Sequence, residues 1–94
     1  MNFEWINKQG VKTEDDIVIQ FTGRFTAEYR DGTKILKLDI DDGVMGNKTC
    51  INFKRSDFTK WDNSGGSLTP TEQERAINIF KEALVFQGLV PLVE

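Results

Sequence analysis

The side chains of this chain that could do chemistry are mainly carboxylates, because histidine is absent and cysteine occurs only once. Without imidazole there is no histidine general base, no Ser-His-Asp or Cys-His arrangement, and no zinc site that needs histidine. The single cysteine, Cys50, forms neither an internal disulfide nor a cysteine-rich metal site. We therefore predict that the protein is not an enzyme and uses no metal and no cofactor.

The acidic residues are unevenly distributed along the chain. Residues 1–47 hold nine acidic and six basic side chains, whereas residues 48–94 hold six of each, so the net charge of −3 arises in the first half. Two short acidic segments, residues 14–16 and 39–42, carry most of this excess negative charge. Their carboxylates are either solvated charges at strand ends or parts of a patch that attracts a basic partner. The candidate contact residues are Glu14, Asp15, Asp16, Asp39, Asp41 and Asp42.

The second acidic segment invites comparison with a calcium-binding loop. An EF-hand loop needs oxygen ligands at its first, third and fifth positions and a glutamate at its twelfth. Counted from Asp39, the fifth position is Gly43 and the twelfth is Cys50, so the pattern fails. A strand end followed by a polar turn is predicted instead.

The elements that must position these carboxylates begin with a β-hairpin. Two segments with a period of two residues flank Asp31-Gly32, a pair that suits the positive φ angles of a type I′ turn. The return strand runs to Asp41, and its alternation directs Asp39 and Asp41 outward together with Lys37. The residues expected to face inward are Phe25, Ala27, Tyr29, Leu36, Leu38 and Ile40.

A helix is predicted near the end of the chain. Thr69 can act as N-cap, Pro70 suits the first helical position, and Glu72 completes a capping box. Apolar residues then recur at three- and four-residue steps as far as Gly88, which suits the position after a helix.

Strand-like segments followed by one helix predict a single α+β domain over residues 1–94. We expect an antiparallel β-meander of four to five strands with one amphipathic C-terminal helix packed on one face. The expected boundaries are a meander over 2–54, a loop over 55–68, a helix over 69–88, and a short strand or tail over 89–94.

The sequence also favours a location and excludes some partners. No stretch of about 18 consecutive apolar residues is present, so no membrane contact is predicted. Residues 1–7 lack the basic and apolar regions of a signal peptide, and a single cysteine suits a reducing compartment. A net negative charge does not favour direct nucleic acid binding. We expect a cytoplasmic protein.

The hairpin, Trp61, the polar loop 62–68, the Thr69-Pro70-Thr71-Glu72 helix start and the helix ending at Gly88 together resemble a known pattern. The pattern is that of small immunity proteins encoded beside bacterial polymorphic toxins, including contact-dependent growth inhibition systems. The resemblance covers about three quarters of the chain.

This resemblance implies a protein that binds one cognate toxin domain and blocks its active site or substrate groove. Many such toxins are nucleases, whose basic clefts suit an acidic partner. The acidic candidates would then be contacts, with Tyr29 or Trp61 as an aromatic anchor, in a monomer or a homodimer. For Trp5 and Trp61 both a core and an interface position remain open. The alternatives are a phage-type inhibitor that mimics nucleic acid on a host nuclease, and a small assembly module that uses an exposed sheet edge.

Overall fold

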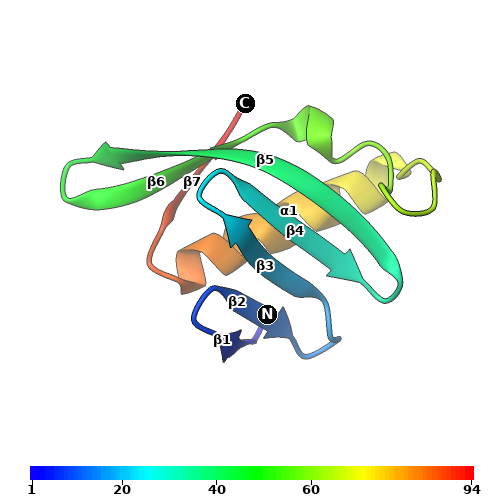
Figure 1. Cartoon of the computed structure of the whole chain (residues 1–94), viewed down its shortest axis with the longest axis horizontal. Helices are drawn as coiled ribbons and strands as arrows, with labels where there is room; N and C mark the ends of the chain where they lie inside the picture. Colours follow the sequence, from blue (N-terminus) through cyan, green and yellow to red (C-terminus); the bar gives the residue numbers. More distant parts are fainter.

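The computed structural model describes all 94 residues and shows an α+β fold, in which a curled sheet wraps one face of a single helix (Figure 1). The order of the strands in the sheet follows their order in the sequence. The elements are β1 (Phe3–Asn7), β2 (Gly10–Thr13), β3 (Val18–Gly23), β4 (Thr26–Asp31), β5 (Lys34–Met45), β6 (Lys48–Phe53), the short 3-10 helix η1 (Arg55–Asp57), α1 (Pro70–Phe86) and β7 (Val90–Val93).

The sheet has seven strands, so the prediction of four to five strands is wrong. Strand β2 has no local signal in the sequence, because Val11 is its only large apolar residue and gives no periodicity. Residues 10–13 form a strand because they pair with β1 on one side and β3 on the other. Strand β7 completes the sheet in the 89–94 segment and runs parallel to β6. The parallel pairing is possible because α1 lies between them and carries the chain back along the sheet.

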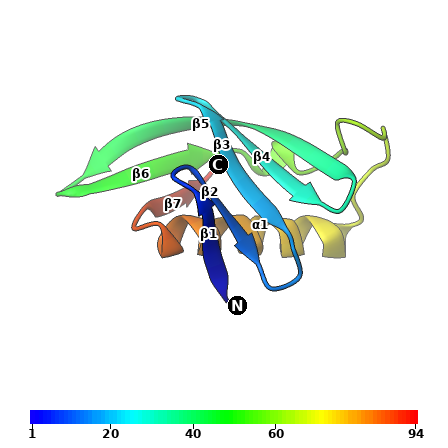
Figure 2. The ribbon, with the colours of Figure 1, turned by 60° about the horizontal axis from the view of Figure 1, so that its bottom comes forward.

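Strand β5 is the longest strand and has two different partners. Its first half, Lys34–Asp39, pairs with β4, and its second half, Ile40–Met45, pairs with β6. The sheet curls around this strand, and α1 runs along its inner side (Figure 2). The first half of β5 consequently has one edge with no strand beside it.

The core lies between the inner face of the sheet and α1. Leu36, Leu38 and Ile40 are buried there, which confirms the predicted alternation of β5. Phe53 packs edge-to-face on Phe80 of α1, with ring centroids 4.8 Å apart. Phe25 was expected to face inward but is 48% exposed, because it lies in the β3–β4 turn before β4 begins.

The predicted helix start is confirmed in detail. The Thr69 hydroxyl accepts a hydrogen bond from the Glu72 N–H at 3.1 Å, and the Glu72 carboxylate accepts one from the Thr69 N–H at 2.9 Å. This second bond lowers the pKa of Glu72. Gly88 follows the helix with φ of 81°, in the left-handed region that favours glycine. The structure has no helix that combines the length and the apolar character needed to cross a membrane.

Candidate functional site

The two predicted acidic segments lie at opposite ends of the sheet. The β2–β3 turn, residues 14–17, is beside the end of β4, because Val18 pairs with Arg30. Asp39 instead pairs with Thr26 at the start of β4. These two pairs are about 13 Å apart along the strands. Successive turns of an antiparallel meander alternate between its two ends (Figure 1), so the two segments do not form one patch.

Within the second segment, strand alternation separates the three carboxylates. Asp39 and Asp41 are exposed on the outer face of β5. Asp42 is directed to the other face, in register with Ile51. Its Oδ2 lies 4.0 Å from Nε of Arg24 in the β3–β4 turn. Asp42 therefore does not lie beside Asp39 and Asp41.

Two further carboxylates lie near Asp39 and Asp41, one at the free edge of β5 and one after β7. Asp57 of η1 accepts a hydrogen bond from the Asp39 backbone N–H at 3.1 Å. Glu94 follows β7, where its N–H donates to the Phe53 carbonyl at 2.8 Å. With Asp39 and Asp41, Glu94 lines a depression of about 90 Å³ that Asn52 and Lys54 also line. We call Asp39, Asp41, Asp57 and Glu94 the β5 acidic surface.

The charges of the β5 acidic surface are not neutralised by ion pairs. None of its four carboxylates lies within 4.0 Å of a lysine or arginine nitrogen. No group of three or more His, Cys, Asp or Glu side chains is placed so that it could hold a metal ion.

The free edge of β5 is closed by side chains of the 55–63 segment. The backbone N–H of Ile35 donates to Asn63 Oδ1 at 2.9 Å, and that of Lys37 donates to Asp62 Oδ2 at 2.6 Å. The Asp62 N–H returns a bond to the Ile35 carbonyl at 2.8 Å. With the bond from Asp39 to Asp57, these contacts replace a neighbouring strand and fix the position of Asp57.

Tyr29 and Trp61 lie in the core beneath this segment, which is one of the two positions left open for Trp61, and neither is the exposed anchor that the resemblance implied. Tyr29 is 1% exposed and Trp61 is 4% exposed, and their rings stack with centroids 6.3 Å apart. Burial, with a contribution from the nearby Asp31 carboxylate, raises the pKa of Tyr29 to about 12. Trp61 thus anchors the loop that carries Asp62, whereas Trp5 is 52% exposed.

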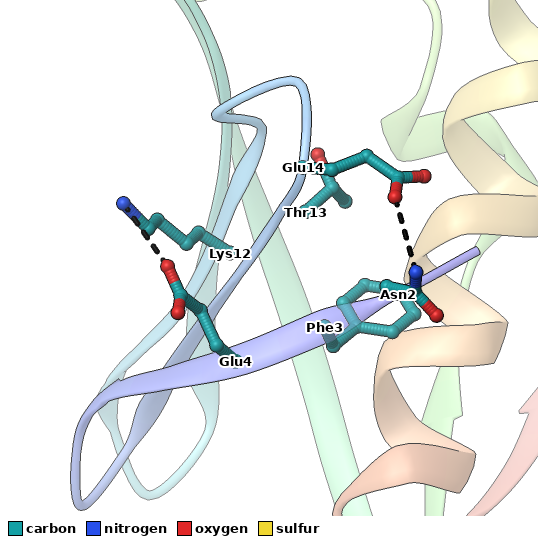
Figure 3. A pocket seen from close by; sticks show the side chains of 6 residues that line it. All are labelled: Asn2, Phe3, Glu4, Lys12, Thr13 and Glu14. Atoms are coloured by element: carbon teal, nitrogen blue, oxygen red, sulfur yellow. Dashed lines mark hydrogen bonds and ion pairs between the residues drawn. The ribbon is translucent and has the colours of Figure 1, made fainter.

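The carboxylates at the other end of the sheet are engaged locally. A depression of about 280 Å³ is lined by the first residues of the chain and by β2 (Figure 3). Lys12 Nζ lies 3.2 Å from Glu4 and 3.5 Å from Asp16, and the hydrogen bond with Glu4 raises the pKa of Lys12. Asn2 donates to Glu14 at 3.3 Å. Of the three acids predicted here, only Asp15 has no side-chain partner.

No protein-family model, curated protein or solved structure matches this chain. The interpretation of the β5 acidic surface consequently depends on its own geometry and charge.

Sequence reasoning missed Asp57 and Glu94. Asp57 lies in a segment expected to be irregular, and Glu94 in one expected to be a short strand or tail. Both reach the site through long-range pairing, Asp57 with Asp39 and the β7 end with Phe53. A sequence signal existed only for Glu94, because an added strand beside 48–54 would bring the last residue close to Lys54.

Proposed function

We propose that this chain is an immunity protein, which binds a cognate bacterial toxin domain and covers its active site or substrate groove with the β5 acidic surface. The observation that carries the proposal is the gathering of four carboxylates without ion pairs around β5, of which Asp39, Asp41 and Glu94 line one depression and Asp57 lies at the neighbouring strand edge. A toxin that cleaves nucleic acid must hold phosphates in a basic cleft. An acidic surface of this kind competes for that cleft and speeds association by electrostatic steering.

The surface is organised before any partner arrives. Asp39 and Asp41 are fixed at a two-residue spacing by the β5 ladder, and Asp57 is held by the Asp39 N–H. Little side-chain and loop ordering is then needed on binding, so more of the electrostatic attraction appears as affinity. This argument supports a contact with a pre-formed basic groove.

The proposal implies an interface area and a cellular location. We expect an interface of about 1,200–2,000 Å², which requires neighbours of the acidic surface such as Lys37 and Asn52 at its rim. Cys50 is free and buried, in keeping with the proposed location in the reducing cytoplasm.

Co-expression with the product of the adjacent gene tests the proposal. We expect the two proteins to purify together and the chain to restore growth of cells that express the toxin. The Asp39→Lys/Asp41→Lys variant should lose this protection while remaining folded by circular dichroism. If no toxin is neutralised, or if the variant protects as well as the parent, the proposal is wrong. A phage cassette around the gene would instead favour an inhibitor of a host nuclease.

A further inference from the structure

A second surface lies on the opposite edge of the sheet, where β1 meets the C-terminal half of α1 (Figure 2). The rings of Phe3 and Trp5 lie 5.7 and 5.8 Å from the ring of Phe86, measured between centroids. Trp5, Val85, Phe86 and Met1 are 52%, 61%, 43% and 53% exposed. A depression of about 410 Å³ lies beside them. We call Met1, Phe3, Trp5, Val85 and Phe86 the β1–α1 apolar patch.

The backbone of β1 is open along the side that borders this patch. Strand β1 is one end of the sheet and pairs only with β2, and β7 is the other end. In an antiparallel sheet the backbone groups of successive residues point to alternate sides of the strand. The Thr13 N–H of β2 donates to the Ile17 carbonyl on the β3 side, so the backbone groups of Lys12 point to the other side, where Lys12 is paired with Glu4 of β1. By the same alternation, Phe3 and Trp5 direct their N–H and C=O groups outward. They are free to accept another strand.

The charges around the patch distinguish between possible occupants. Lys81 and Glu82 both line the depression, so its rim carries one charge of each sign. In a two-fold symmetric dimer the same rim of both copies is in contact, so that the positive charge of one copy can lie opposite the negative charge of the other. The β5 acidic surface carries four negative charges and would repel its own copy. A second copy of this chain is therefore the occupant that the β1–α1 apolar patch suits.

We propose that two copies of the chain associate through the β1–α1 apolar patch, with their β1 strands antiparallel. Pairing of outward-directed residues allows a two-fold axis at Glu4 or at Trp5. An axis at Glu4 places two carboxylates directly opposite each other, which is unfavourable. An axis at Trp5 places the two indoles opposite each other, so this is the register we assign; the pairing is short, because the β1–β2 register shifts between Trp5 and Asn7 and the outward alternation ends at Trp5.

The contact combines buried apolar area with pairing of two strand edges. Large aromatic side chains bury about 150–250 Å² each when covered, so the exposed halves of Trp5 and Phe86 offer roughly 150–250 Å² per copy. Met1 and Val85 add to this area, and the strand edge adds backbone hydrogen bonds. The patch lies on the β1 edge of the sheet, whereas the β5 acidic surface lies at β5, η1 and the C-terminus. The dimer consequently leaves both acidic surfaces free.

Sedimentation equilibrium over about 5–500 µM tests the dimer with two matched variants. Val85→Glu places a charge in the patch, and Val44→Glu makes the same change at the 78% exposed Val44, far along β5. We expect the parent and Val44→Glu to dimerise equally, and Val85→Glu to dimerise roughly 10- to 100-fold more weakly. Trp5→Lys, which places a lysine on the strand edge, should also block dimerisation.

Tryptophan fluorescence gives an independent readout of the same equilibrium. Trp61 is buried in either state, so a blue shift of the emission with rising concentration reports burial of Trp5. A parent chain that stays monomeric over the whole range overturns the proposal. Equal dimerisation of Val85→Glu and Val44→Glu, with both variants folded, also overturns it because the dimer must then use another surface.

Discussion

Two edges of this sheet, that of the first half of β5 and the outer edge of β1, differ in what covers them. The free edge of the first half of β5 is closed by Asn63, Asp62 and Asp57, whose side chains accept its backbone hydrogen bonds. The outer edge of β1 has no such cover and borders exposed apolar side chains. A closed edge excludes strand addition and leaves charged side chains to make contacts, whereas an open edge admits another strand. The difference is the reason why we propose unlike partners for the β5 acidic surface and the β1–α1 apolar patch.

Substitution of the two tryptophans should give the largest difference in stability between these regions. Trp61→Ala removes the buried ring under the loop that carries Asp57 and Asp62, and we expect it to lower the free energy of unfolding by about 3–5 kcal/mol. Trp5→Ala changes a half-exposed side chain, and a change within about 1 kcal/mol is expected. Urea denaturation at a concentration where the chain is monomeric measures both. Equal losses would contradict the placement of one ring in the core and the other in the patch.

Alkaline titration sharpens the same contrast through Tyr29, the only tyrosine. Its pKa is raised to about 12 by burial, whereas an unfolded chain releases the proton near the ordinary value of about 10. The folded state therefore holds more protons between these values, and the free energy of unfolding falls as the pH rises from about 10 to about 12. Below pH of about 10 this group has no effect. Tyrosinate absorbance of the folded protein measures the pKa, and ionisation near 10 would show that Tyr29 is solvated.

Removal of one edge-closing side chain should have a smaller effect. Asp62→Ala leaves the Lys37 N–H without its acceptor, at a cost of about 1–2 kcal/mol. Asp15→Ala is the control, because the Asp15 carboxylate has no hydrogen-bond or ion-pair partner and its loss should change stability by less than about 0.5 kcal/mol. Thermal unfolding compares the two. The closed-edge interpretation would be wrong if both variants matched the parent, and faster hydrogen exchange at Lys37 in Asp62→Ala would support it.

Local signals in the sequence were sufficient for the parts of the fold that depend on neighbours in the chain. The Asp31-Gly32 hairpin follows from alternation, and the start of α1 follows from Thr69 and Glu72. Strand β2 and the parallel β6–β7 pairing depend on partners elsewhere in the chain, so no local pattern revealed them. The candidate site divides in the same way.

Alternation alone predicted that Asp39 and Asp41 face outward on β5. It did not predict that Asp57 and Glu94 join them, because those contacts depend on how the 55–63 segment and β7 pack. The burial of Trp61 has the same cause, since the ring is covered by tertiary contacts of a loop. Residue types predicted an acidic surface, and the fold showed which of the acids lie together.

The most direct test of the account compares two charge reversals on binding of the cognate toxin. Asp39→Lys/Asp41→Lys alters the β5 acidic surface, and Glu14→Lys/Asp15→Lys makes the same change in net charge at the other end of the sheet. Isothermal titration calorimetry at several salt concentrations should show the first variant binding roughly 100- to 1,000-fold more weakly and with less salt dependence. The second should bind within about threefold of the parent. Equal losses in the two variants, or no loss in the first, would contradict an interaction through the β5 acidic surface.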